Sequence, residues 1–504
     1  MKITPDFRTF AANWSVGKNQ ALSAQHVSDL ETPVSAMIKL CYNKNYCFLL
    51  ESMEGDSVRG RYSIIGRNPD LIWRCQQGGK VRLNREALTK LDAYETVESP
   101  PLDHLKALLD ECHMDEQDQP VPMASGLFGY LGYDMIRYME RIPDDKPLGV
   151  DVDEAILIRP TLLAIFDQVD NKFIIVAPAW YDKTLSAETA YHRAQERIEQ
   201  ARYDLAQRMP PKSNFVVTPS QSTLVSNMTE SDYVDKVRRA QKYIRDGDIF
   251  QVVLSLRFSR PFTLDPFSLY RTIRRLDPSP FLFYFDLKDF SIVGSSPEIL
   301  VRVREGKVTI RPIAGTRPRG QSNQTDQELE SDLRSDPKEL AEHLMLLDLG
   351  RNDVGRVAEI GSVKVTSRNS VEYYKHVMHI VSNVEGKLDQ KHTPLEALVG
   401  GFPAGTVSGS PKIRAMEIIA ELEPDRRGVY AGCIGYFGAN GTLDTAIAIR
   451  TAVIKNNIMH VQAGAGIVYD SHPASEYKEC VAKARGMLRA ADETILASQN
   501  PRDE

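Results

Sequence analysis

The stretch that decides the fold is residues 430–483, YAGCIGYFGANGTLDTAIAIRTAVIKNNIMHVQAGAGIVYDSHPASEYKECVAK. The dipeptides Asn440-Gly441 and Asn456-Asn457 favour tight turns, and each separates two runs rich in Val, Ile, Ala and Thr. This pattern predicts three antiparallel strands. A helix is predicted to follow them from about Ala474.

The second and third of these strands carry groups that suit an anionic ligand. In the second strand Arg450 is predicted to share a face with Ala446 and Ala448, and such small neighbours leave room for a ligand. The third strand ends in Gly464-Ala465-Gly466, where glycine lets backbone N–H groups approach a bound group closely. Together these groups favour a small anionic substrate.

Carboxylates on two predicted helices favour a divalent cation beside that substrate. In the helix after the strands, Glu476, Glu479 and Lys483 are three and four positions apart and therefore lie on one face. Glu342 lies in an earlier helix that is predicted to begin at Asp336. Two carboxylates on separate helices can bind Mg²⁺ while leaving positions for water and substrate oxygens. A single helical glutamate is more often a solvated charge, so the hypothesis depends on the glutamates coinciding with the arginine and the glycines.

Length and composition describe a globular chain. It has 504 residues, of which 42% are hydrophobic and 26% charged. The net charge of −6 gives no basic footprint for nucleic acid, and the chain has no run of 18 apolar residues that would predict a membrane span. The N-terminus lacks the apolar segment of a secretory signal, and the six cysteines form no C-x-x-C motif. We therefore expect a cytoplasmic protein.

The turn signals along the chain predict an α+β fold. Antiparallel hairpin signals recur, and they argue against the alternating strand and helix order of a parallel sheet. Residues 210–228 are rich in Pro and Ser. They are predicted to link an N-terminal lobe, residues 1–209, to a C-terminal lobe, residues 229–504.

Two segments each have a structural and a functional interpretation. Phe48-Leu49-Leu50-Glu51-Ser52 is an apolar strand that ends on an acid and a hydroxyl, so it either runs into a solvated turn or lines a pocket for an amino acid. His379 lies in an apolar run, where a histidine is more often a hydrogen-bonded core residue than a functional one. The residues alone leave both alternatives open.

A series of short motifs runs through the chain in a fixed order. They are Leu50-Glu51-Ser52, Gly60-Arg61-Tyr62-Ser63, Gln251-Val252-Val253, Pro278-Ser279-Pro280, Ser296-Pro297-Glu298, residues 312–320 (PIAGTRPRG), residues 342–353 (EHLMLLDLGRND), Val377-Met378-His379, residues 403–412 (PAGTVSGSPK) and residues 462–466 (QAGAG). In these motifs, from about Pro33 to Ala491, the chain resembles the chorismate-utilising enzymes, and most closely the anthranilate synthase large subunits. The resemblance implies two antiparallel β-sheets packed as a sandwich with helices outside.

The resemblance implies that this chain binds chorismate, a small dicarboxylate, together with Mg²⁺. The family holds Mg²⁺ on Glu342 and Glu479, and the ion clamps the ring carboxylate. Arg450 can engage the other carboxylate through its guanidinium fork. The remaining expected contacts to chorismate come from Gly315, Thr316, Tyr430, Gly464, Ala465 and Gly466.

The resemblance also implies the first step of tryptophan biosynthesis, in which ammonia attacks C2 of chorismate, the C4 hydroxyl departs, and pyruvate is then lost to leave anthranilate. The departing hydroxyl needs a general acid, and Glu298 is expected to supply the proton. His379 is expected to act in the loss of pyruvate, with Thr406 nearby. Relatives with other chemistry typically carry Lys at the positions of Ala314 or Gln251, so these two residues favour ammonia as the nucleophile.

A partner is implied because ammonia is mostly ammonium at neutral pH. The family obtains it from a glutamine amidotransferase, and no Cys-His-Glu triad for that reaction is found in this sequence. We therefore expect a separate amidotransferase small subunit, in a hetero-oligomer of two large and two small subunits.

Two segments together resemble the family's tryptophan feedback site, and they are Leu50-Glu51-Ser52 and Pro280-Phe281-Leu282. Indole needs an apolar slot, and the polar end of the amino acid needs the groups of Glu51 and Ser52. The enterobacterial pattern at the second segment is Pro-Tyr-Met, from which Phe281-Leu282 departs. Inhibition by tryptophan is expected.

Two other functions remain open on the sequence. One is an enzyme of the same family that stops at 2-amino-2-deoxyisochorismate without releasing pyruvate. The other is a catalytically silent, tryptophan-binding regulatory protein. The intact set of Glu342, Glu479, Arg450 and His379 argues against the second.

Overall fold

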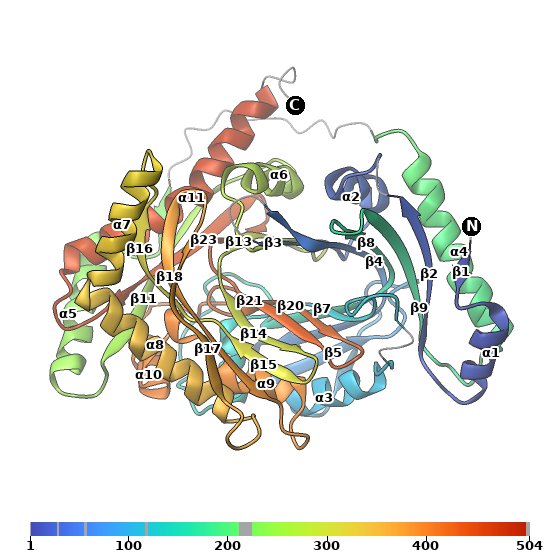
Figure 1. The fold of residues 1–504 in the computed structure, drawn as a ribbon, viewed down its shortest axis with the longest axis horizontal. Helices are drawn as coiled ribbons and strands as arrows, with labels where there is room; N and C mark the ends of the chain where they lie inside the picture. Colours follow the sequence, from blue (N-terminus) through green and yellow to red (C-terminus); the bar gives the residue numbers. More distant parts are fainter. Residues whose placement is uncertain (1, 28–29, 55–57, 116–118, 211–223, 500–504) are drawn as a thin grey trace.

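The computed structural model describes residues 2–27, 30–54, 58–115, 119–210 and 224–499 (Figure 1). Within these ranges the strands form one hydrogen-bonded network of 23 strands, and every strand pair in it is antiparallel. The prediction of helices combined with antiparallel strands is confirmed. Most of the predicted linker lies outside the described residues, and the division into two lobes stays a prediction. None of the helices in the described ranges is long and apolar enough to cross a membrane.

Two long strands tie the network together. β4 (Val58–Gln76) and β8 (Ala155–Asp167) pair with each other over much of their length. Every residue of β8, AILIRPTLLAIFD, is buried, and such a nearly continuous apolar run is typical of a strand covered on both faces. Two branches of strands extend from this pair.

The two branches alternate between segments that lie far apart in the sequence. The first leaves β4 and runs, in order of pairing, through β3 (Cys47–Glu54), β12 (Phe281–Asp286), β13 (Ser291–Ser296), β22 (Thr451–Lys455), β23 (Ile458–Ile467) and β11 (Gln251–Pro261). The second leaves β8 and runs through β7 (Gly126–Leu131), β20 (Cys433–Gly438), β21 (Leu443–Ile447), β14 (Ile299–Arg304), β15 (Lys307–Ile310) and β18 (Val377–Lys387). Because β4 and β8 join the branches, the described strands are one continuous network, and the two separate sheets implied by the resemblance are not distinct.

The remaining strands extend this network at several points. They are β1 (Ile3–Thr4), β2 (Gln20–Val27), β5 (Lys80–Asn84), β6 (Glu95–Val97), β9 (Lys172–Ala179), β10 (Val225–Ser226), β16 (Ile313–Pro318), β17 (Lys364–Tyr373) and β19 (Gly409–Ser410). β16 and β17 both pair with β18.

Helices surround the strands in Figure 1. They are α1 (Phe7–Ser15), α2 (Pro33–Cys41), α3 (Pro101–Glu111), α4 (Ala187–Ala206), α5 (Glu230–Arg245), α6 (Pro266–Leu276), α7 (Asn323–Ser335), α8 (Pro337–Gly355), α9 (Pro394–Gly401), α10 (Lys412–Leu422) and α11 (Pro473–Gln499). The predicted starts of α8 and α11 are confirmed. At the start of α8 the Asp336 carboxylate accepts the N–H groups of Lys338 and Glu339, which is a regular N-terminal cap. α11 packs against β23 and against α5 and α6.

The prediction of three strands in residues 430–483 is wrong, because the second one is broken. β21 ends at Ile447 and pairs with β14 and β20, whereas β22 begins at Thr451 and pairs with β13 and β23. The chain therefore crosses from one branch to the other between these residues. Arg450 lies in this crossing with a left-handed φ of 48° rather than on a strand face. The predicted turn at Asn456-Asn457 is confirmed, and both residues have positive φ.

Candidate active site

One cavity of about 620 Å³ collects side chains from both branches and from two helices. Its walls include Gln251, Glu298, Ala314, Gly315, Thr316, Glu339, Glu342, His379, Thr406, Tyr430, Arg450, Gly464, Gly466, Glu476, Glu479 and Lys483. Every residue that the sequence analysis expected to contact chorismate, a metal or the reacting atoms is among them, except Ala465. Most of the motifs that are dispersed along the sequence thus contribute to one cavity.

Ala465 lies outside this cavity because side chains and backbone groups alternate along β23. It pairs with Leu254 of β11 and is fully buried. The neighbouring Gly464 carbonyl accepts a hydrogen bond of 3.0 Å from Lys483 Nζ, so it points away from β11. In an antiparallel strand the N–H and C=O of one residue share an edge, so the N–H of Gly464 also points toward the cavity side.

Only glycine fits at position 464. A Cβ atom there would lie 2.7 Å from the hydroxyl oxygen of Tyr430 and 3.0 Å from the carbonyl oxygen of Leu254. The ring of Tyr430 lies over the guanidinium of Arg427, which is itself held by Glu423. The tyrosine hydroxyl and the glycine backbone are therefore packed together as one rigid wall of the cavity.

The carboxylates of α8 and α11 form an acidic side of the cavity. Glu342 comes from α8, and burial raises its pKa, to which the carboxylates of Glu339 and Glu479 add. Burial likewise raises the pKa of Glu476 on α11, with Glu479 adding to it. The ammonium of Lys483 lies 2.8 Å from Glu479, and the Arg317 guanidinium lies 3.2 Å from Glu339. Carboxylates that disfavour each other's ionisation fit a divalent cation.

The described residues contain no group of three or more His, Cys, Asp or Glu side chains arranged to hold a metal ion. Mg²⁺ is commonly bound through one or two carboxylates, with water and substrate oxygens completing its shell. Glu342 and Glu479 provide two such carboxylates. The residues present therefore fit Mg²⁺ bound jointly with a carboxylate substrate.

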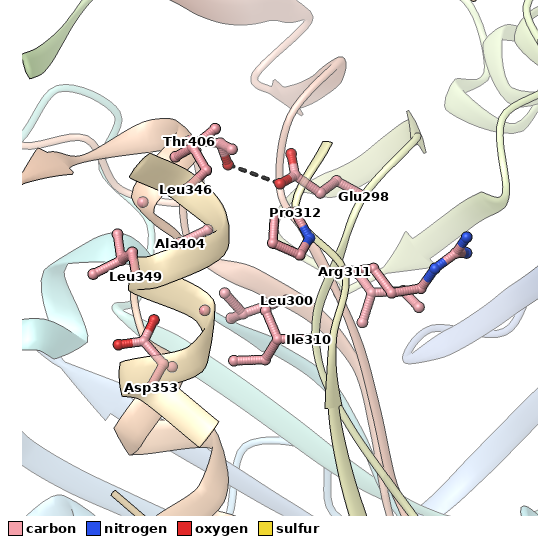
Figure 2. Close-up of a pocket in the computed structure, with 14 residues that line it drawn as sticks. Glu298, Leu300, Ile310, Arg311, Pro312, Leu346, Leu349, Asp353, Ala404 and Thr406 are labelled. Atoms are coloured by element: carbon pink, nitrogen blue, oxygen red, sulfur yellow. Dashed lines mark hydrogen bonds between the residues drawn. The ribbon is translucent and has the colours of Figure 1, made fainter. Parts of the chain in front are cut away.

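Glu298 is a buried carboxyl group at the junction of two cavities. Burial raises its pKa to about 8, so the group is protonated at neutral pH. The Thr406 hydroxyl donates a hydrogen bond of 3.0 Å to Glu298 Oε1, and Figure 2 shows the two side chains facing each other. Behind them lies a second cavity of about 30 Å³, whose lining includes the apolar side chains of Leu300, Ile310 and Leu346. Thr406 lines the same cavity as His379, and its hydroxyl bonds to Glu298.

His379 is held in one orientation as a neutral imidazole. Its Nδ1 lies 2.9 Å from the carbonyl oxygen of Gly315 and 3.1 Å from Thr316 Oγ1. Because a carbonyl oxygen can only accept, Nδ1 carries the hydrogen and Nε2 keeps its lone pair. Burial lowers the histidine pKa to about 4, so the ring is neutral at pH 7.

Arg450 has two polar contacts that the sequence analysis missed. Its Nη1 lies 3.5 Å from Ser279 Oγ and 3.7 Å from Asp277 Oδ2. About a third of its side chain is exposed. The motif Pro278-Ser279-Pro280 was recognised in the sequence, but nothing in its pattern indicated contact with a residue so distant in the chain.

A third cavity, of about 70 Å³, brings together the two segments that resemble a tryptophan site. Leu50, Glu51, Ser52, Phe281 and Leu282 line it, and Pro280 does not. The segments meet because β3 and β12 pair, with Ser52 opposite Phe281 and Glu51 opposite Leu282.

The expected polar groups, Glu51 and Ser52, line this cavity, but the Glu51 carboxylate is already hydrogen-bonded within the protein. The Glu51 carboxylate accepts hydrogen bonds from Tyr270 and Arg274 of α6, and from Ser63. Its acceptors are therefore engaged inside the protein. Asp444 also lines the cavity, is buried, and has one carboxylate oxygen, Oδ1, without a hydrogen-bond partner among the described residues. An acid within the apolar segment of β21 was the available sequence signal.

Comparisons with known proteins agree with this geometry. The chain matches the family described as chorismate binding enzyme over residues 47–489. It is 51% identical over 490 residues to anthranilate synthase component 1 of Cereibacter sphaeroides, which covers 97% of this chain and 98% of the relative. It is 44% identical over 507 residues to anthranilate synthase component 1 of Synechocystis sp., covering 97% of this chain and 99% of the relative.

A solved structure is similar over most of its length. The crystal structure of anthranilate synthase component I from Streptococcus pneumoniae superposes with a TM-score of 0.75 at 38% identity, covering 86% of this chain and 93% of the other. The sequence matches and this superposition agree on one assignment. The chain belongs to the chorismate-binding enzyme family and, within it, to the anthranilate synthase component 1 proteins.

Proposed function

We propose that the chain, as an anthranilate synthase component 1, converts chorismate and ammonia into anthranilate, pyruvate and water, the first step of tryptophan biosynthesis. The observation that carries this proposal is one cavity that Glu342 and Glu479, from separate helices, line together with Arg450, Glu298 and His379. The cavity volume of about 620 Å³ accommodates a small dicarboxylate with its metal ion.

In this proposal the two carboxylates of chorismate bind at opposite sides of the cavity. The Arg450 guanidinium binds the enolpyruvyl carboxylate, with the Tyr430 hydroxyl and the N–H of Gly464 beside it. Glu342 and Glu479 would hold Mg²⁺, which supplies positive charge for the ring carboxylate when bound. Gly315 and Thr316 border the ring, and the glycine at 466 leaves space beside Gln251.

Two protein groups move the protons of the reaction. Ammonia forms the bond to C2, the ring double bonds shift, and the C4–O bond breaks as the neutral carboxyl of Glu298 donates its proton, so that water leaves. The ammonium group formed at C2 returns a proton to the Glu298 carboxylate. His379 Nε2 then removes the proton from C2, the C3–O bond breaks, and the departing enolate becomes pyruvate when its methylene carbon takes up a proton from His379, which returns to its neutral form. The Thr406 hydroxyl holds Glu298 in place during the first step.

Supply of ammonia requires a partner in this proposal. The relatives are each called component 1, a name for one part of a larger enzyme. We assign the other part to a glutamine amidotransferase small subunit, in an assembly of two large and two small subunits located in the cytoplasm. Ala314 and Gln251 line the cavity, and neither can act as the lysine nucleophile or base of relatives that use other chemistry.

Tryptophan is proposed to bind in the cavity of about 70 Å³ and to inhibit the enzyme. The lobe of residues 1–209 contributes Leu50, Glu51 and Ser52, and the lobe of residues 229–504 contributes Phe281 and Leu282. Pro280 precedes this pair and shapes the chain that leads into it. Asp444 Oδ1 is the acceptor that remains for a donor of the bound amino acid.

The test is a single assay with the purified full chain, chorismate, Mg²⁺ and ammonium at alkaline pH. We expect anthranilate fluorescence to rise together with an equimolar amount of pyruvate. A ring product that keeps the enolpyruvyl group would identify 2-amino-2-deoxyisochorismate formation instead. Absence of any amine product would contradict the proposal.

A further inference from the structure

α6 and its C-terminal cap contact one lining residue of each ligand cavity through side chains one helical turn apart. Arg274, in its last turn, donates two hydrogen bonds to the Glu51 carboxylate of β3, which lines the tryptophan cavity. Asp277 is the C-terminal cap of the same helix, and its carboxylate lies 3.7 Å from the Arg450 guanidinium in the chorismate cavity. A shift of the end of α6 would therefore change side-chain contacts at both cavities.

A row of paired strands makes a second connection between the cavities. Glu51 of β3 is opposite Leu282 of β12, and Leu282 is opposite Ser295 of β13. The Ser295 N–H then donates to the backbone carbonyl of Arg450 at 3.2 Å. This row of strands thus connects Glu51, in the cavity of about 70 Å³, to Arg450, the proposed substrate-binding residue.

The Ser295 side chain joins the loop between α6 and β12 to this row of strands by hydrogen bonds. Its hydroxyl donates to the carbonyl of Asp277 at 2.6 Å and accepts the N–H of Ser279 at 3.0 Å. Ser279 is buried, and its own hydroxyl lies 3.5 Å from Arg450 Nη1. The position of this loop therefore depends on that of β13, which is paired with β12.

The carboxylate of Asp277 has the same chemistry as the substrate group that Arg450 binds. We propose that Asp277 is a positioning residue that engages Arg450 when chorismate is absent, and that bound tryptophan favours this engaged arrangement through α6 and the row from Glu51 to Ser295. The inference rests on the proposed function of the two cavities. Its consequence is that chorismate must displace Asp277, so the two ligands oppose each other's binding.

The exposed positions of the two groups fit a contact that can be exchanged. The side chain of Asp277 is 42% exposed and that of Arg450 is 34% exposed, and ion pairs at such positions are weak. A substrate carboxylate that accepts two hydrogen bonds from the Arg450 guanidinium can replace the aspartate. An effector can only shift such an equilibrium through its different affinity for the two arrangements.

The experiment measures the coupling between the two ligands directly. Isothermal titration calorimetry of the full chain gives the tryptophan Kd with Mg²⁺ present and ammonium absent, so that chorismate binds without turnover, at zero and at saturating chorismate. In the unaltered chain we expect chorismate to raise the tryptophan Kd by at least about fivefold. In Asp277→Asn the ratio should fall toward one, while the tryptophan Kd without chorismate changes by less than about twofold.

Steady-state kinetics distinguish a positioning role of Asp277 from a general loss of structure in the variant. Asp277→Asn should lower the KM for chorismate by about two- to fivefold at unchanged kcat, because the competing charge is removed. Asp277→Glu should restore the coupling ratio at least in part. Asp92→Asn is the matched control, since Asp92 pairs with Lys288 at the other end of the β12–β13 hairpin and should change nothing.

Unchanged coupling in Asp277→Asn would overturn the inference, and so would a ratio of one in the unaltered chain. A coupling ratio lost equally in Asp92→Asn would also overturn it, because the effect would then be unspecific. Failure of the proposed function is distinguishable, since it appears as absence of anthranilate in the unaltered chain whatever the tryptophan Kd.

Discussion

Glu342 of α8 and Glu479 of α11 line one cavity from separate helices, and burial together with the nearby carboxylates, Glu479 included, raises the pKa of Glu342. Two acids that are far apart in the sequence thus lie close together in a cavity that Arg450 also lines. The account depends on this arrangement, because a bound cation relieves the repulsion between the acids.

Replacing either acid should remove the dependence of activity on Mg²⁺. We expect Glu342→Gln and Glu479→Gln each to lower anthranilate formation at least about 100-fold, because each removes a charged oxygen ligand and even outer-shell substitutions weaken metal sites about 10- to 100-fold. The measurement is the initial rate as a function of Mg²⁺ concentration. Glu493→Gln is the control on α11, where Glu493 pairs with Arg489 one turn earlier in the helix, and it should behave as the unaltered chain.

Replacing Glu298 should remove the general acid and its pH dependence. Because its pKa is raised to about 8, Glu298 is protonated and active below that pH, and kcat should fall as the pH rises above it. Glu298→Gln should lower kcat by about 10²- to 10⁴-fold and abolish this alkaline decline. The rates must be compared at a constant concentration of neutral ammonia. An alkaline decline that persists in Glu298→Gln would assign the ionisation to another group.

The same carboxyl group should make the fold less stable at alkaline pH. Its pKa in the folded chain is raised above the ordinary glutamate value of about 4.5. Its contribution is therefore fully present below about pH 4.5 and is lost as the pH rises through about 8. Denaturant unfolding should show a smaller loss of stability across this window in Glu298→Gln than in the unaltered chain. An identical pH dependence in both chains would contradict the assignment.

Replacing His379 should separate the two steps of the reaction. His379→Ala removes the base for loss of pyruvate and leaves the amination groups Glu298 and Arg450 in place, so 2-amino-2-deoxyisochorismate should accumulate. Anthranilate formation should fall about 10²- to 10⁴-fold. Chromatography of the ring products makes the distinction. Full anthranilate production by this variant would remove His379 from the mechanism.

Filling the tryptophan cavity should relieve inhibition without loss of catalysis. Ser52→Phe places a large ring in a cavity of about 70 Å³, so the concentration of tryptophan that gives half inhibition should rise at least about tenfold, equivalent to about 1.4 kcal/mol. Ser15→Phe, on the exposed surface of α1, is the control. Equal inhibition of both variants would show that tryptophan binds elsewhere.

Local patterns predicted the elements of this fold better than their connections. The cap at Asp336 and the turn at Asn456-Asn457 are encoded within a few residues, and both predictions are confirmed. The break at Arg450 was missed because residues 443–455 read as one apolar run. Which partner each half pairs with is decided by β14 and β13, more than 100 residues earlier in the chain.

The same limit applied to the candidate site. Side-chain types and spacing predicted that Glu342 and Glu479 act together, and the helices that carry them follow from capping and periodicity. The partner of Thr406 depends on tertiary packing and was not predictable. Glu51 was expected to meet a ligand, whereas α6 engages its carboxylate, because no local pattern links residues so distant in sequence.

The most direct test of the central claim is electron paramagnetic resonance of Mn²⁺, used in place of Mg²⁺, titrated with the full chain in the presence and absence of chorismate without ammonium. The account predicts that chorismate tightens Mn²⁺ binding in the unaltered chain, and that this effect disappears in both Glu342→Gln and Glu479→Gln. Tight, chorismate-dependent Mn²⁺ binding that survives in both variants would contradict the claim that these two acids hold the cation against the substrate.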